Sequence, residues 1–153
     1  MAPILNSGEL IITDKIDNFL GNLSSNLGTG YQRGDIVVFQ KPKYKDFVKR
    51  IVGLPGEKVS IKNGHVFVNE VELKEDYILE HTTLGGDFLS SEGPEIVIPE
   101  DRYLVLGDNR IDSLDSRYND IGLINKAWIK GKVILKYWPL SSFTIFKRPI
   151  YNI

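Results

Sequence analysis

Short runs of β-branched and aromatic residues, separated by glycine, proline and asparagine, recur along the whole chain. They lie at residues 10–13, 35–39, 47–52, 58–61, 66–68, 95–98, 103–106 and 131–138. Short strands at regular spacing with turn residues between them are typical of all-β sandwiches and barrels. We therefore expect a mostly β fold built of antiparallel sheets.

The middle of the chain carries the strongest turn signal. Asn63 and Gly64 lie between two of the apolar runs, and this dipeptide supplies the positive φ angles of a type I′ hairpin turn. Residues 57–99 are rich in such hairpin signals, and residues 82–93 are rich in Gly, Ser and Thr. We expect a single domain over residues 1–153 with an inserted hairpin-rich subdomain at about 57–99, whose tip is mobile. Residues 14–27 are the best helix candidate, but Gly21 weakens it, and we interpret this stretch as a surface excursion.

Composition narrows the possible chemistry. The 153 residues are 42% hydrophobic and 25% charged, as in ordinary soluble globular domains. There is no cysteine and there are only two histidines, so disulfides, thiolate catalysis and cysteine-ligated zinc are excluded, and we expect no metal and no cofactor. A net charge of -1 gives no general attraction to nucleic acid, and we interpret the basic stretch at residues 41–50 as a solvated loop that enters a strand. The sequence has no apolar window of about 18 residues that could span a membrane.

Lys49 is the first candidate for catalysis. In a strand of period two it shares a face with Phe47 and Ile51, so its ammonium group loses solvation. Desolvation lowers a lysine pKa, and a neutral lysine can act as the general base for a serine hydroxyl. A lysine that snorkels from an edge strand is the alternative, and the strand alone leaves both open.

A polar segment at residues 107–117 follows the buried-looking run at residues 103–106. It holds three aspartates, two arginines, an asparagine and two serines. A polar loop that leaves a β-strand is a common place for a site. A surface turn crosslinked by local salt bridges fits the same composition, so this segment alone also leaves both interpretations open.

Four blocks in order resemble those of type I signal peptidases. They are residues 1–9, 33–39, 46–57 and 107–117, and residues 138–141 resemble the last strand of that family. The resemblance covers nearly the whole chain apart from the expected insertion. It implies a β fold like that of signal peptidases and of SOS-repressor proteases, and a serine/lysine dyad endopeptidase.

The resemblance also implies roles for individual residues. Lys49 is the general base, and Ser113 orients its amine. Asp108 with Arg50 and Asp115 with Arg117 form ion pairs that hold the final loop against the lysine strand. Two shallow apolar pockets, for the first and third side chains before the scissile bond, are lined by Met1, Leu5, Ile11, Val38, Phe47 and Val48. The edge of the strand from Asp46 to Lys49 pairs with the extended substrate by main-chain hydrogen bonds.

The chain departs from the family pattern at its start. The motif reads Ser-Met-x-Pro-Thr-Leu, and the sequence begins at its methionine, so we expect the nucleophilic serine immediately before Met1. We also expect the chain to be inactive without that serine, and to continue upstream into one or more membrane anchors. Ile4 stands where the family has threonine, and Glu9 and Glu57 stand for common aspartates. Ser7 lies in a turn signature and does not fit the nucleophile's place.

The expected function is the removal of signal peptides from exported preproteins on the extracytoplasmic side of the cell membrane, by a monomer. Of Trp128, Trp138, Phe143, Ile145 and Phe146, we expect most to belong to the core and a subset to form an exposed patch that rests on the bilayer, since tryptophan suits the headgroup region. We interpret Glu72, Glu75, Asp76 and Glu80, which surround His81, as solvated surface without a role. Two alternatives are the self-cleaving domain of SOS-response repressors and a peptidase-like scaffold that binds peptides or proteins but does not cut.

Overall fold

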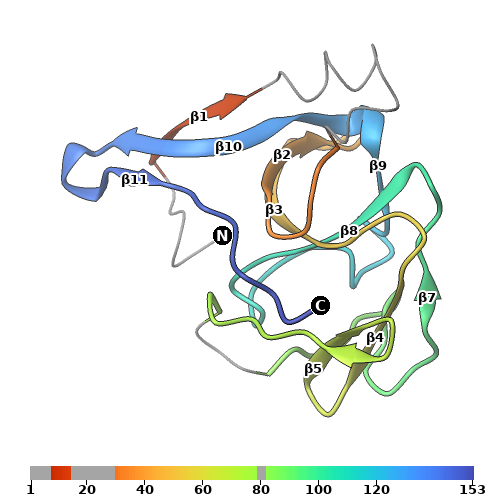
Figure 1. Cartoon of the computed structure of the whole chain (residues 1–153). Coiled ribbons are helices and arrows are strands. Elements are labelled where there is room, and N and C mark those ends of the chain that lie inside the picture. The colour runs from red at the N-terminus through yellow and green to blue at the C-terminus, as the bar shows by residue number, and fades with distance from the viewer. Residues whose placement is uncertain (1–7, 15–29, 79–81) are drawn as a thin grey trace.

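Two antiparallel sheets form the molecule in the computed structural model, which describes residues 8–14, 30–78 and 82–153 (Figure 1). The first sheet has the strand order β1-β10-β2-β3-β8-β9, and β11 also pairs with β10. Its strands are β1 (Leu10–Asp14), β2 (Ile36–Gln40), β3 (Asp46–Gly53), β8 (Arg102–Leu106), β9 (Ile124–Asn125), β10 (Ile129–Trp138) and β11 (Thr144–Ile145). Two short 3-10 helices, η1 (Lys126–Trp128) and η2 (Leu140–Ser142), flank β10. The prediction of a mostly β antiparallel fold is confirmed.

The second sheet lies below the first in Figure 1 and has the order β6-β5-β4-β7. Its strands are β4 (Lys58–Lys62), β5 (His65–Val68), β6 (Val71–Glu72) and β7 (Ile96–Val97). Asn63 and Gly64 join β4 to β5 with φ angles of 50° and 77°. Positive φ at both central residues defines the type I′ turn, so this prediction is confirmed.

Strand β3 separates two apolar cores because its side chains alternate between the two faces of the sheet. Ile51 packs on one face with Val37, Phe39 and Val105. Val52 packs on the other face, in a cluster that also contains Val59, Ile61, Val66 and Val68 of the second sheet. The second sheet is therefore tied to the first by a shared core, and β3 lies at the centre of the molecule.

The segment 82–93 does not project as the free tip that its composition suggested. Leu89 is fully buried in the core between the sheets. The backbone N–H groups of Phe88 and Leu89 donate to the carbonyl of Arg117 at 2.9 and 3.1 Å. At Gly86 a Cβ would lie 2.3 Å from that same oxygen, so only glycine permits this close approach. Gly86 thus lets this segment dock against the 107–117 loop.

Several expectations fall on residues outside the described part of the chain. These are the pocket residues Met1 and Leu5, most of the 14–27 excursion, Glu80 and His81. Within the described residues, no helix is both long enough and apolar enough to cross a membrane.

Candidate active site

Lys49 lies near the middle of β3, and its side chain is only 8% exposed. Its Nζ donates a hydrogen bond to Oγ of Ser113 at 2.7 Å. Burial lowers the pKa of Lys49, and the negative charge of Asp115 opposes this shift without cancelling it. A buried amine of lowered pKa is a different group from a lysine that snorkels into water.

Gly107 gives Ser113 the room to reach Lys49. A Cβ at position 107 would lie 2.0 Å from Oγ of Ser113 and 3.4 Å from Nζ of Lys49. The backbone N–H of Gly107 donates to Oδ2 of Asp115 at 3.0 Å. The turn after β8 is therefore packed directly beneath the Lys49–Ser113 contact.

Arg50, the neighbour of Lys49, points to the opposite face of β3 and is buried there. Its Nε and Nη2 bind the two carboxylate oxygens of Asp108 at 2.9 and 2.8 Å, and Nη1 donates to the carbonyl of Gly34 at 2.8 Å. Burial disfavours the charge on Arg50, but the hydrogen bonds and charge of Asp108 outweigh it, and the net effect raises the pKa of Arg50. This bidentate pair fixes the start of the 107–117 loop to β3.

Asp115 and Arg117 form a second buried pair within the loop. The Arg117 Nε and Nη2 lie 2.8 and 3.0 Å from the Asp115 carboxylate oxygens. Arg117 also donates to the carbonyl of Ser113 at 3.3 Å. The structure thus brings together all six residues that the resemblance assigned to catalysis and its support, where the 107–117 loop packs against Lys49 and Arg50 of β3.

The apolar residues assigned to substrate binding separate into two groups. Ile11, Val38 and Val48 pack together around Ile36 and Val133 on one face of the first sheet. Phe47 lies on the other face, where its ring stacks on Phe39 with 5.5 Å between centroids. Neighbouring strand residues point to opposite faces, so Phe47 and Val48 do not line one surface with their side chains.

The start of β3 has one open edge. Residues 46–50 of β3 pair with β2 on one side, whereas β8 pairs with the other side only from Arg50 onward. Of the strands in residues 8–14, 30–78 and 82–153, none pairs with Asp46 to Lys49 on that second side. The carboxylate of Asp46 binds Nζ of Lys130 at 2.7 and 2.9 Å across the sheet. A main-chain edge that ends beside a buried lysine is therefore available to an extended peptide.

Comparison with known proteins identifies the family to which this site belongs. The family model described as "Signal peptidase, peptidase S26" matches residues 1–138. The chain belongs to the signal peptidase family. Signal peptidase I U of Bacillus subtilis is 36% identical over an alignment of 150 positions, which spans 92% of this chain and 72% of the relative. Signal peptidase IB of Staphylococcus aureus is 38% identical over an alignment of 154 positions, which spans 94% of this chain and 75% of the relative.

A solved structure extends the likeness to the fold. The crystal structure of a signal peptidase I from Enterococcus faecalis aligns with a TM-score of 0.56 and 34% identity, covering 67% of this chain and 95% of that one. The predicted signal-peptidase-like β fold is confirmed. The predicted activity, an endopeptidase that removes signal peptides from preproteins, is confirmed as the activity of this family.

Sequence reasoning missed three residues of this signal peptidase that lie beneath the site. Glu75 was interpreted as solvated surface, but it is only 8% exposed and binds Arg110, a residue of the 107–117 loop to which no role was given. Tyr77 donates to Glu75 at 2.6 Å, and its ring lies 4.2 Å from the guanidinium carbon of Arg50. The sequence does not reveal that Glu75 is buried, because it stands among other acidic residues and no hydrophobic periodicity distinguishes it from them.

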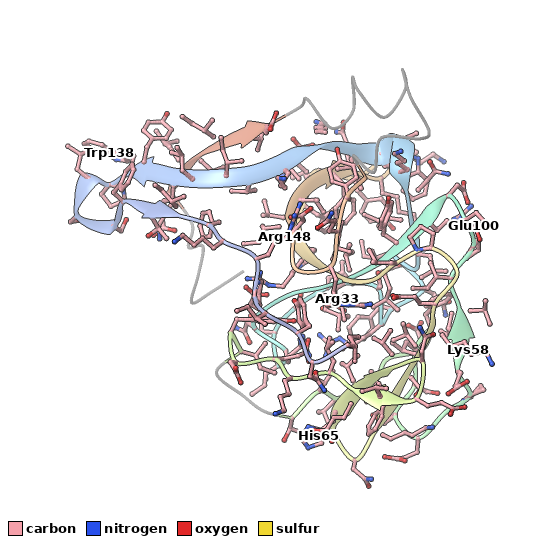
Figure 2. The ribbon with its side chains drawn as sticks, in the orientation of Figure 1. Arg33, Lys58, His65, Glu100, Trp138 and Arg148 are labelled. Atoms are coloured by element: carbon pink, nitrogen blue, oxygen red, sulfur yellow. The ribbon has the colours of Figure 1, made fainter. Side chains whose placement is uncertain are left out.

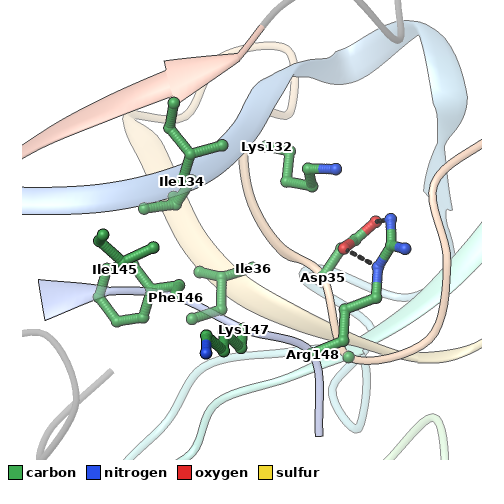
Figure 3. Close-up of a pocket in the computed structure, with 10 residues that line it drawn as sticks. Asp35, Ile36, Lys132, Ile134, Ile145, Phe146, Lys147 and Arg148 are labelled. Carbon is green, nitrogen blue, oxygen red and sulfur yellow. Dashed lines mark hydrogen bonds and ion pairs between the residues drawn. The ribbon is translucent and has the colours of Figure 1, made fainter.

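A cavity of about 490 Å³ lies on the face of the first sheet that carries Ile36 (Figure 3). Ile134, Ile145 and Phe146 supply apolar walls, and Arg148 binds Asp35 across its edge with Nε 2.6 Å from Oδ1. Lys49 and Ser113 do not line it. The cavity is therefore separate from the dyad, and the ion pair fastens the C-terminal segment to the start of β2.

Proposed function

We propose that Lys49 is the general base of a serine endopeptidase and that the nucleophile is a serine placed directly before Met1. The observation that carries this proposal is the buried Lys49 amine, of lowered pKa, held by Ser113 at the end of an open strand edge. A neutral amine can take the proton of a serine hydroxyl at a pH where an ordinary lysine is charged. The serine oxygen then attacks the scissile carbonyl, and the lysine returns the proton to the leaving amine.

The substrate lies along the open edge of β3 in this proposal. Main-chain groups of Asp46 to Lys49 pair with the residues before the scissile bond, as in other cases of β-strand addition. Ile11, Val38 and Val48 offer an apolar surface for a small side chain of the substrate. Phe47 contributes main-chain groups, because its ring belongs to the opposite core. The chemistry proposed here needs no cofactor, and we propose that the protein acts as a monomer.

Ser113 provides the test of this assignment. The assay uses an extended chain, in which a few residues ending in serine precede Met1, and a signal-peptide substrate. Ser113→Ala should lower kcat about 10²-fold with little change in the free energy of unfolding, because a misoriented base loses far more rate than one half-exposed hydrogen bond contributes to stability. Ser90→Ala, at an exposed serine, should have normal kcat. Full activity of Ser113→Ala would show that the 107–117 loop is wrongly assigned.

We further propose that the end of β10 rests on the outer surface of the cell membrane. Trp138 lies at the tip of this strand, far from Lys58 and Glu100 (Figure 2). Exposed apolar side chains gather there, at Leu10, Ile12, Trp138, Leu140, Phe143 and Ile145, with exposures from 45 to 74%. Large exposed apolar patches mark interaction sites, and tryptophan suits the headgroup region. Trp128 and Phe146 do not belong to this patch, because they pack on the cores beneath the sheet.

Vesicle binding tests the lipid surface directly. Phe143→Ser combined with Ile145→Ser should reduce partitioning of the chain into phospholipid vesicles about 10²-fold or more, since each apolar side chain contributes ~1.5 kcal/mol or more when buried. Cosedimentation at moderate salt measures it. The control pair Val71→Ser with Val97→Ser removes two exposed apolar residues of the second sheet and should bind normally. Absence of binding by the unmodified chain, or equal loss in both pairs, would contradict this proposal.

A further inference from the structure

A buried ion pair joins the 57–99 segment to the loop that carries Ser113. Both terminal nitrogens of Arg110 contact the carboxylate of Glu75, with Nη1 at 2.7 Å from Oε2. Arg110 is 1% exposed and Glu75 is 8% exposed. Removing one partner of such a pair leaves the other charge buried and uncompensated, which is strongly unfavourable. The pair is therefore held together as long as the molecule is folded.

Arg110 in turn binds both ends of the catalytic loop. Its Nε donates to the carbonyl of Gly107 at 3.1 Å, and its own carbonyl accepts from Nη1 of Arg117 at 2.8 Å. Gly107 packs against Oγ of Ser113, and Arg117 donates to the carbonyl of Ser113. Arg110 therefore links Glu75 to Gly107 and Arg117, and both of these residues contact Ser113.

Other residues of the 57–99 segment hold Glu75 and Arg110 in place. Tyr77 donates to Oε1 of Glu75, and the hydroxyl of Thr83 accepts from Arg110 at 2.6 Å. Burial, together with the charge of Glu75, raises the pKa of Tyr77 well above its ordinary value, so the phenol keeps its proton and remains a donor. The Tyr77 ring also covers the guanidinium of Arg50. Glu75 and Tyr77 of the 57–99 segment therefore contact the two arginines beneath the site, Arg110 and Arg50 respectively.

We infer that Glu75 is a positioning residue for the Lys49–Ser113 pair, acting through Arg110 on the loop that presents Ser113. The inference rests on the proposed roles of Lys49 and Ser113. It gives the 57–99 segment a part in catalysis, because the segment supplies the carboxylate that sets the loop. Glu75 does not touch the substrate in this arrangement; it sets the distance at which Ser113 meets the lysine amine.

The first measurement is the kinetics of Glu75→Gln in the extended chain. The amide keeps the shape of the side chain but loses its charge and one of its two acceptors for Arg110. We expect kcat to fall about tenfold with KM nearly unchanged, because the strand edge that binds substrate is untouched while the base is misoriented. Glu72→Gln is the matched control, since Glu72 lies on the same segment with its side chain 55% exposed, and it should have normal kcat and KM.

A double-mutant cycle with Ser113→Ala separates positioning from general stability. If Glu75 acts through Ser113, Glu75→Gln should change kcat less than about twofold in the Ser113→Ala background. A tenfold loss in both backgrounds, or normal kcat of Glu75→Gln, would overturn the inference. Normal kcat of Ser113→Ala alone would instead overturn the proposed function. Urea unfolding of each variant shows whether it is folded at the assay temperature.

A second variant keeps the test decisive if Glu75→Gln does not fold. Thr83→Val removes one hydrogen bond to Arg110 without removing a charge. It should lower kcat by a smaller factor, about threefold, and this loss should also vanish in the Ser113→Ala background. An equal loss of kcat in both backgrounds would count against positioning through Arg110.

Discussion

Replacing Lys49 by methionine in the extended chain is expected to lower kcat about 10⁴-fold or more, as removal of a base from a catalytic unit does in other serine proteases. Methionine can occupy the same buried position in β3 but carries no titratable group. Substrate affinity should change little, because the strand edge binds through the main chain. Single-turnover cleavage of a signal-peptide substrate measures the loss. Lys58→Met, at an exposed lysine of β4, is the control and should cleave normally.

The pH profile gives the same prediction a second test. Because burial lowers the pKa of Lys49 from the ordinary 10.5, activity should rise with pH through one ionisation that lies below that value. Lys49→Arg should be inactive over the whole range, since arginine keeps its proton. A flat profile limited by chemistry, or substantial turnover by Lys49→Arg, would show that another group is the base.

The lowered pKa also has a consequence for stability that needs no catalysis. The folded state binds the Lys49 proton less readily than the unfolded state does, so burying this lysine costs free energy at low pH. The cost is full below the folded pKa and fades as pH rises toward the unfolded value. Lys49→Met should therefore raise the free energy of unfolding more at about pH 6 than at about pH 9.5. A stability difference that is independent of pH would contradict the lowered pKa.

The strands were predictable because each long run combines β-branched residues with flanking turn residues. The predicted runs at residues 47–52 and 103–106 lie within β3 (Asp46–Gly53) and β8 (Arg102–Leu106). Strands β6, β9 and β11 were missed, since two paired residues leave no periodic pattern and form only because a longer neighbour is present. Whether such short strands form depends on pairing with strands elsewhere in the fold, which the sequence alone does not show.

The candidate site was predictable only in part, for a related reason. The apolar neighbours of Lys49 in its own strand already indicated a desolvated amine, and the structure places it in a buried position. The partner of Arg110 was not predictable, because Glu75 lies far away in sequence within an acidic run. The period-two pattern of β3 correctly placed Phe47 on the face of Ile51. The resemblance nevertheless assigned Phe47 and Val48 to the same pockets, because it supplies residue positions without the face to which each side chain points.

In the extended chain, the serine placed directly before Met1 is expected to be the nucleophile, and changing it to alanine should lower kcat about 10⁴-fold or more. We expect Ser113 not to replace it, because Oγ of Ser113 is packed against Gly107 in the loop, where it is a hydrogen-bond partner of the Lys49 amine at 2.7 Å. The alanine variant should still bind a signal-peptide substrate, since neither the strand edge nor the surface at Ile11, Val38 and Val48 is altered. Fluorescence titration with a labelled substrate measures the binding, and cleavage assays measure the rate.

Two further measurements identify the attacking oxygen. Acid quenching during turnover should trap an acyl group on the peptide that contains the added serine, and mass spectrometry locates it. Ser7→Ala in the extended chain is the matched control and should cleave normally, because the turn signature at residues 6–9 places Ser7 beyond the nucleophile's position in the motif. Turnover by the alanine variant, or loss of turnover in Ser7→Ala, would transfer the nucleophile to another residue. Binding without cleavage by the serine-extended chain itself would favour the peptide-binding scaffold over the enzyme.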